Sequence, residues 1–186
     1  MSSPKVLSMS SRPPSSPDGM QPTTKFDSRF SDPAAEATPF ADAERALERA
    51  ELYWLTTVRA DGRPHVTPLI GIYHEGAVHF ATGTGEQKFR NLEHSRTVAV
   101  TTGANAWDKG LDIVVEGEAV RITDNAKLHE LADVIEAKYG EVWHFDVGDG
   151  VFGAQGKDPA HVFRVEPSKV LAFAKDPHGQ TSFRFD

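Results

Sequence analysis

The chain has 186 residues, a net charge of −7 and no cysteine. This length favours a single domain with a core of its own. The lack of cysteine excludes disulfides and thiolate metal sites. The acidic balance disfavours nucleic acid as a partner, because affinity for nucleic acid depends on basic surface. No apolar run reaches the ~18 residues of a membrane span, and the first residues lack the apolar core of a signal peptide, so we expect a cytoplasmic protein.

The first 39 residues are rich in Ser and Pro and show no sustained apolar periodicity. This composition predicts a disordered tail over residues 1–39, followed by one domain over residues 40–186. A short helix is expected at about 41–51, directly after Pro39, with charged residues on its exposed face.

The segment from residue 52 to residue 102 predicts a β-meander interrupted by one helix. Short apolar runs are separated by the turn pairs Asp61-Gly62 and Glu75-Gly76. Pro68 interrupts one of these runs and implies a sheet edge or a bulge, since proline cannot donate a ladder hydrogen bond. The expected strands are 52–59, 65–73, 77–82 and 97–102, and the expected helix is 86–94.

The second half of the chain predicts more strands around one longer helix. Apolar residues at helical spacing indicate a helix over 123–139, with Thr123 as its N-cap. Gly117 suggests a bend or bulge, and the long loop 140–159 is a candidate lid that carries Trp143. The expected strands are 111–122, 161–166, 170–175 and 182–185. Short sequential strands with tight turns favour a mainly β fold, a small antiparallel barrel.

Residues 82–91, with the sequence TGTGEQKFRN, form the first candidate site. Glycines at a strand-to-helix turn let backbone N–H groups converge, and a helix N-terminus adds partial positive charge, so a phosphate is favoured there. Thr82 and Thr84 offer hydroxyls, and Lys88 can reach the same anion. The motif is neither a P-loop nor a dinucleotide fingerprint. The alternative interpretation is an ordinary glycine-rich turn with a solvated lysine.

Residues 65–68, with the sequence His-Val-Thr-Pro, form the second candidate site. If Pro68 forces a bulge, backbone groups that lose their strand partners can face a ligand. Such groups, together with Thr67, could contact a flat heteroaromatic ring with polar edges. Simple protection of a sheet edge is the alternative interpretation.

Other kinds of chemistry have no motif in this chain. The eight histidines form no HExxH or HxH pattern, so no metal site is predicted. No GxSxG elbow is present, and no catalytic residue is assigned. Trp107 lies in a long loop, where its indole could cover a ligand ring or fill an interface.

The order of these motifs resembles a known family. DGRPHVTP at 61–68, the Thr-Gly strand end at 82–83 and KFRNL at 88–92 are similar to pyridoxamine 5′-phosphate oxidase-like split-barrel proteins, in particular to their flavin/deazaflavin oxidoreductase branch. The chain also ends in a similar way, with VEPSKV at 165–170 and TSFRF at 181–185. The resemblance covers about residues 42–186.

The resemblance implies a six-stranded antiparallel split β-barrel and a homodimer with its cofactor in a groove between the subunits. The cofactor would be FMN or the deazaflavin coenzyme F420. Its phosphate would contact Thr82, Gly83, Thr84 and Lys88, with Arg90 and Asn91 beside them. Its ring would lie near His65, Val66, Thr67 and Pro68, and Trp107 or Trp143 of the other subunit would close the groove.

The implied activity is that of an oxidoreductase, which moves hydride between the cofactor ring and a small organic substrate. The alternative is non-catalytic storage or sensing of a flavin or haem, with His65 or His79 as a candidate haem ligand. The chain ends in SFRFD and lacks the W-x-x-x-R-L motif with which authentic pyridoxamine-phosphate oxidases hold the substrate phosphate. Oxidation of vitamin B6 is therefore not expected.

Overall fold

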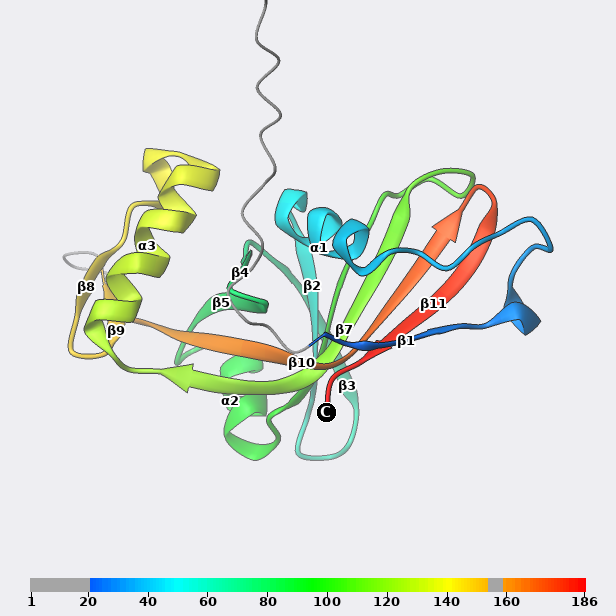
Figure 1. The fold of residues 1–186 in the computed structure, drawn as a ribbon. Helices are drawn as coiled ribbons and strands as arrows, with labels where there is room; N and C mark the ends of the chain where they lie inside the picture. The colour runs from blue at the N-terminus through cyan, green and yellow to red at the C-terminus, as the bar shows by residue number, and fades with distance from the viewer. Residues whose placement is uncertain (1–20, 154–158) are drawn as a thin grey trace, which may run out of the picture.

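The computed structural model describes residues 21–153 and 159–186. The strands of this part join one sheet, with antiparallel pairing throughout, that curls into a barrel with helices around it (Figure 1). The helices are α1 (Phe40–Arg49), α2 (Gln87–His94) and α3 (Asn125–Tyr139), with single turns η1 (Ser28–Phe30) and η2 (Glu141–Trp143). The expected mainly β, split-barrel fold is confirmed.

The sheet contains eleven strands, whereas the residue patterns predicted eight and the family resemblance implied a six-stranded barrel. They are β1 (Thr23–Phe26), β2 (Tyr53–Val58), β3 (Pro64–Leu69), β4 (Ile72–His74), β5 (Ala77–Gly83), β6 (Thr97–Thr102), β7 (Leu111–Ile122), β8 (Asp146–Gly148), β9 (Val151–Gly153), β10 (Ala160–Lys175) and β11 (His178–Arg184). The main path runs β1-β11-β10-β7-β6-β2-β3, and β5 also pairs with β10. β10 therefore joins β5, and through it β4, to the main path.

The structure has one strand, β10, where two separate strands were expected at 161–166 and 170–175. It is one strand with a register shift between Pro167 and Lys169, where Ser168 is the extra residue. The hydroxyl of Ser168 donates to the carbonyl of Glu116 at 3.0 Å. Gly117 lies opposite the bulge, and a Cβ there would come 2.3 Å from the Glu166 carbonyl oxygen. The predicted bulge exists, but the extra residue belongs to the neighbouring strand.

The expectation of disorder over 1–39 is wrong for residues 21–39, while residues 1–20 lie outside the described residues. β1 pairs with β11 along its whole length. The backbone N–H of Thr38 donates to the Thr181 hydroxyl at 3.0 Å, and both side chains are buried. β1 has few apolar residues because a strand at a sheet edge is held mainly by its backbone hydrogen bonds.

Three boundaries also differ from expectation. The strand expected at 65–73 is divided at Gly71, where a Cβ would lie 2.9 Å from the His79 carbonyl oxygen. The N-cap of α3 is Asp124, not Thr123, because its carboxylate accepts from the Ala126 N–H at 3.0 Å. The loop expected at 140–159 contains η2, β8 and β9, and its residues 154–158 lie outside the described residues.

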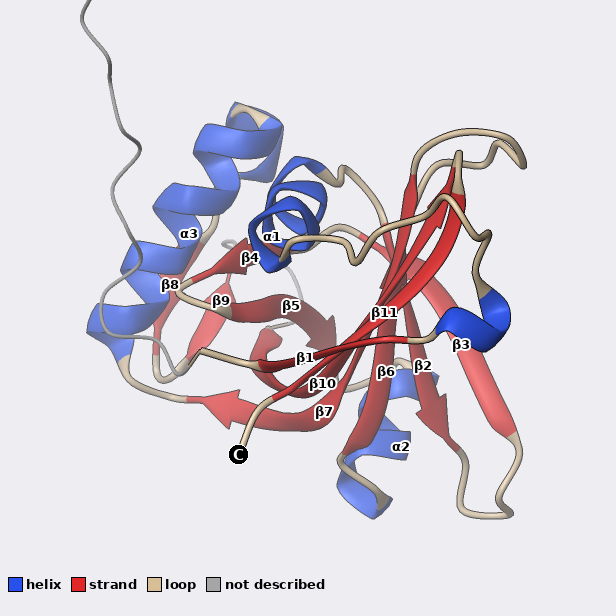
Figure 2. Ribbon diagram, turned by 45° about the vertical axis from the view of Figure 1, so that its right-hand side comes forward, coloured by secondary structure: helices blue, strands red, loops and turns tan. Residues whose placement is uncertain are grey.

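Apolar side chains pack into two cores. One fills the barrel and is closed by α1, where the Tyr53 hydroxyl donates to the Leu47 carbonyl at 2.5 Å. The other lies between α3 and the strands β4, β5 and β10, and includes Ile72, Leu131 and Ile135. α1 and α3 lie toward one end of the barrel and α2 at the opposite end (Figures 1 and 2).

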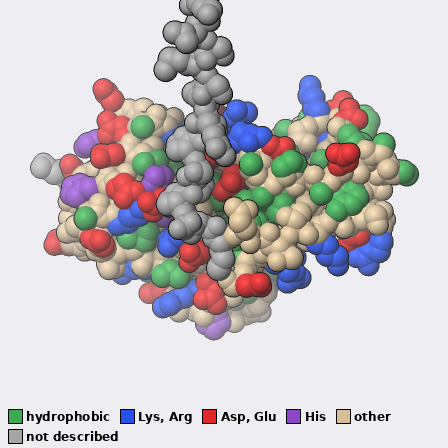
Figure 3. Space-filling model, viewed as in Figure 1, with side chains coloured by type: hydrophobic (Ala, Val, Ile, Leu, Met, Phe, Trp, Pro, Cys, Tyr) green, Lys and Arg blue, Asp and Glu red, His purple; other side chains and the backbone are tan. Residues whose placement is uncertain are grey.

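Acidic and basic side chains are interspersed over the face shown in Figure 3, without a broad surface of one sign. Among the helices formed by residues 21–153 and 159–186, none has both the length and the apolar character that a membrane crossing requires.

His79 on β5 is a buried polar residue without a hydrogen-bond partner among the described residues. Its side chain is 1% exposed, and neither ring nitrogen has a hydrogen-bond partner. Burial is the main cause that lowers the pKa of His79 to about 4, and the positive charges of Arg164, His74 and Lys127 contribute to this shift. The imidazole is therefore neutral in the folded protein at neutral pH.

This burial predicts a loss of stability in acid. Between pH 6.5 and 4 the unfolded chain takes up a proton on His79 that the folded chain does not, so the free energy of unfolding falls by roughly 3 kcal/mol from this group. We expect His79→Leu to flatten the fall of stability with pH in this window, measured by urea unfolding. The exposed His129→Leu should leave the slope unchanged; equal slopes in all three proteins would contradict the prediction.

Candidate functional site

The turn between β5 and α2 brings together the residues predicted to bind a phosphate. Gly83 and Glu86 close it, with the Glu86 N–H donating to the Gly83 carbonyl at 3.1 Å. Glu86 precedes the first residue of α2 with extended backbone angles, φ −82° and ψ 146°. Its side chain does not cap the helix. The carboxylate instead turns back over the strand end.

Three donors converge on this carboxylate, and together they form what we call the anion cradle: the Thr82 hydroxyl, the Gly83 N–H and the Lys88 ammonium. Glu86 Oε1 accepts from Thr82 Oγ1 at 3.1 Å and from Gly83 N at 2.9 Å. Glu86 Oε2 pairs with Lys88 Nζ. The structure thus brings three of the predicted donors together, and the chain's own carboxylate occupies them.

The interpretation of Lys88 as a solvated lysine is wrong. Its residue is 6% exposed and its ammonium reaches Glu86 from within the barrel wall. Partial burial raises the pKa of Glu86, but the hydrogen bonds from Lys88, Gly83 and Thr82 outweigh it and leave the pKa below its usual range. Glu86 is therefore an anion at neutral pH.

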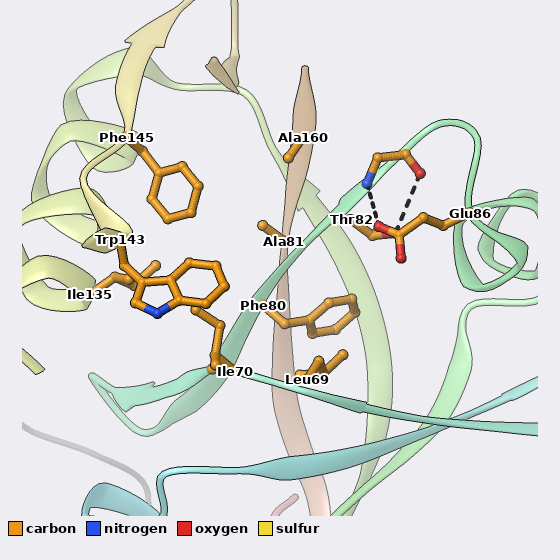
Figure 4. A pocket seen from close by; sticks show the side chains of 12 residues that line it. Leu69, Ile70, Phe80, Ala81, Thr82, Glu86, Ile135, Trp143, Phe145 and Ala160 are labelled. Carbon is orange, nitrogen blue, oxygen red and sulfur yellow. Dashed lines mark hydrogen bonds between the residues drawn. The ribbon is translucent and has the colours of Figure 1, made fainter. Parts of the chain in front are cut away.

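An apolar cavity of about 250 Å³ adjoins the anion cradle. Figure 4 shows Trp143 and Phe145 on one side of it and the Glu86 carboxylate on the other. Phe145 stacks on Phe152 with ring centroids 4.8 Å apart, which fixes that wall. The lining residues are Leu69, Ile70, Gly71, Phe80, Ala81, Thr82, Gly83, Glu86, Ile135, Trp143, Phe145 and Ala160. The cavity therefore joins the end of β3 to the anion cradle.

β3, which carries the second predicted site, is an edge of the sheet path and has no bulge at Pro68, because its register with β2 is continuous. The Arg59 N–H bonds to the Arg63 carbonyl at 2.9 Å. Backbone groups alternate in direction along such a pair, so positions 64, 66 and 68 face the open edge. Positions 64 and 68 are prolines, which have no N–H. Val66 is therefore the residue of β3 whose N–H faces the open edge.

The side chains of His65 and Thr67 lie on the face of β3 that is turned toward α2. Partial burial lowers the pKa of His65, and the charges of Arg59 and Lys88 lower it further. Thr67 Oγ1 lies 3.4 Å from His65 Nδ1. Thr57, which lies opposite His65 on β2, accepts a hydrogen bond from Asn91 of α2. This part of β3 therefore lies near the helix that carries Lys88, but none of residues 65–68 lines the cavity.

Four predicted site residues lie elsewhere. Thr84 and Arg90 are exposed on the turn and on α2. Asn91 is buried and structural, since its amide donates to the Thr57 hydroxyl at 2.8 Å. Trp107 is 91% exposed and belongs to the loop between β6 and β7. This loop lies at the opposite end of the barrel from α2 (Figure 1). Within one chain, Trp107 does not reach the anion cradle.

The sequence interpretation missed Glu86 and Phe145. A signal for Glu86 existed in its spacing: a glutamate three residues after Gly83 can reach back to the Gly83 N–H, as in a capping box. Phe145 had no such signal, because its position depends on how η2 folds against α3.

A cluster of His74, Glu75 and Glu130 has the ligand types of a metal site, with the ligand atoms within 4.8 Å of one another. The ammonium of Lys127 already supplies a positive charge at this cluster. Its ammonium lies 2.6 Å from a Glu75 oxygen and 2.8 Å from a Glu130 oxygen. These contacts account for the cluster as an ion-pair network.

Solved structures with the same fold come from several bacteria. A conserved hypothetical protein from Mycobacterium tuberculosis has a TM-score of 0.63 at 17% identity, over 76% of this chain and 88% of that chain. A heme binding protein from Mycobacterium smegmatis has a TM-score of 0.61 at 14% identity, over 79% and 59%. The heme storage protein HutZ from Vibrio cholerae has a TM-score of 0.57 at 18% identity, over 76% and 96%.

No curated protein matches the chain in sequence. A family model does: that of pyridoxamine 5′-phosphate oxidase matches residues 40–174, which include the anion cradle, β3 and α3. The chain belongs to the pyridoxamine 5′-phosphate oxidase family of split-barrel proteins.

Proposed function

We propose that the protein is an oxidoreductase that binds FMN or the deazaflavin coenzyme F420 and transfers hydride to or from a small organic substrate. The observation that carries this proposal is the meeting of an anion cradle and an apolar cavity at the end of β3. A phosphate-bearing ring cofactor needs both features. The donor set suits a phosphate, because it already holds the carboxylate of Glu86.

Each part of the site has a task in this proposal. Lys88, Thr82 and the Gly83 N–H would hold the cofactor phosphate, and the Val66 edge group would contact the polar edge of the ring. The cofactor supplies hydride transfer, while the protein supplies position and electrostatics. Trp143 and Phe145 would exclude water from the reacting face.

The cavity wall indicates the substrate class. Among the described residues that line it, none is Lys or Arg, and Glu86 is the charged one. An anionic substrate would find no cation there, so a small uncharged and largely apolar molecule is favoured. This argues against a vitamin B6 phosphate, in agreement with the missing W-x-x-x-R-L motif.

We also propose that the protein acts as a homodimer. A cavity of about 250 Å³ lies below the ~300–1,000 Å³ of sites for drug-sized ligands, so a cofactor would need a further wall. The outer face of the sheet offers a surface for a second copy. A continuous, mostly apolar row of opposed residues crosses it, namely Pro68, Trp54, Thr101, Val114 and Leu171. Trp107 of the second copy is the candidate to close the groove.

Storage or sensing of haem is the second candidate, favoured by the two heme proteins of the same fold. His79 is not suited to be the iron ligand, because it is 1% exposed in the core beneath α3. His65 on the edge strand is partly exposed and is the remaining candidate.

The absorption spectrum separates the two candidates. We expect the purified protein, mixed with FMN or the deazaflavin coenzyme, to retain one of them through gel filtration and to show a cofactor band that responds to reductant. Retention of haem with a Soret band, together with no binding of either cofactor, would favour storage or sensing and contradict the oxidoreductase.

Lys88→Met should weaken FMN binding by roughly 1.5–3 kcal/mol, because it removes a charged hydrogen bond and keeps the volume of the side chain. Riboflavin has no phosphate, so its affinity should not change. Fluorescence titration measures both. Lys127→Ala on α3 is the control and should bind FMN like the native protein. Equal FMN affinity in Lys88→Met and the native protein would contradict the assignment of the phosphate to the anion cradle.

Trp54→Glu should convert the dimer to a monomer, because it places a charge in the middle of the apolar row, where Trp54 is 39% exposed. Light scattering after gel filtration gives the mass. Val142→Glu, on the exposed side of η2, should remain a dimer. A native protein that is monomeric at micromolar concentration would refute the dimer.

A further inference from the structure

Glu86 directs its side chain away from the helix that it begins. A residue at this position ordinarily accepts a hydrogen bond from an N–H of the first helical turn. The Glu86 side chain accepts no such hydrogen bond from α2. Both carboxylate oxygens instead contact groups of the anion cradle, Oε1 at Thr82 and Gly83 and Oε2 at Lys88. The side chain is therefore committed to the site and not to the helix.

The two charged partners differ in their freedom to move. The Lys88 side chain is 7% exposed, whereas the Glu86 side chain is 49% exposed. Lys88 is held in the barrel wall by its surroundings. Glu86 approaches from the solvent side and can rotate outward without disturbing the apolar cores. The anion cradle can thus exchange one anion for another.

A phosphate and the Glu86 carboxylate cannot use the anion cradle together. Both would need the Lys88 ammonium and the Gly83 N–H, and two anions at that separation repel each other. A phosphate that enters must therefore displace Glu86. The free energy of phosphate binding is then reduced by the free energy of the contacts that Glu86 loses.

We propose that Glu86 is a specificity-determining gate of the anion cradle, which competes with the phosphate of the cofactor. In the native chain, the phosphate group consequently adds less to the affinity of a ring compound than the three donors would allow without Glu86. This inference rests on the proposed cofactor site, but inorganic phosphate tests the anion cradle by itself.

A purely structural role for Glu86 gives a different expectation. If Glu86 only neutralises the buried Lys88, Glu86→Gln lowers the melting temperature and leaves the affinity for anions unchanged. If Glu86 is the gate, the same substitution raises that affinity, because Lys88 then lacks its internal anion.

The first experiment titrates inorganic phosphate into the native protein and Glu86→Gln by calorimetry. We expect Glu86→Gln to bind phosphate about tenfold more tightly. Glu93→Gln removes the same charge from the exposed side of α2 and should behave as the native protein. Glu86→Ala is measured in parallel, so that one poorly folding variant does not decide the result. Equal phosphate affinity in the native protein and both Glu86 variants overturns the gate.

The second experiment compares FMN with riboflavin. The preference for FMN should rise about tenfold in Glu86→Gln, and this gain should disappear when Lys88→Met is added. Flavin binding with an unchanged FMN preference overturns the gate and leaves the proposed function intact. Absence of binding of FMN and of the deazaflavin coenzyme contradicts the proposed function, while the phosphate titration still decides the role of Glu86.

Discussion

A buried ammonium needs an anion, and the site of this protein is organised around that requirement. Lys88 is 6% exposed, and removing its charge from water costs several kcal/mol unless a partner offsets the loss. α2 fixes Lys88 there, because Asn91 of the same helix is hydrogen-bonded to Thr57 of β2. The barrel wall thus sets the position of the charge. Any ligand of the anion cradle must replace the carboxylate of Glu86 and supply at least the same contacts.

Local chemistry made part of this site predictable. The glycine-rich turn, the following helix and the strand before it are defined by neighbouring residues, so Thr82, Gly83 and Lys88 could be assigned to one anion site. Glu86 stood in the same motif and was still missed, since the direction of a side chain depends on which partners the tertiary fold brings near. The same reason explains β1, whose backbone pairs with β11, a strand more than a hundred residues away in sequence.

The prolines of β3 were a more reliable guide than its apolar residues. A proline in a strand implies an edge or a bulge, and the register with β2 shows an edge. Pro64 and Pro68 occupy outward positions, which leaves Val66 with the edge N–H of this strand. An edge that cannot pair fully with another strand is less prone to extend the sheet and more open to a ligand. The sequence could not show this alternation, because it depends on which residues of β2 face β3.

The buried ammonium of Lys88 also constrains what the site can bind at one time. In the part of the chain that the structure describes, the cavity wall carries no Lys or Arg, and Lys88 reaches the site through the anion cradle. If a cofactor phosphate takes Lys88, no second cation remains for an anionic substrate in the cavity. In the proposed function, the described wall therefore offers a cation to one phosphate and not to two. This wall is the reason why we propose a charged cofactor together with a neutral, apolar substrate for this member of the family.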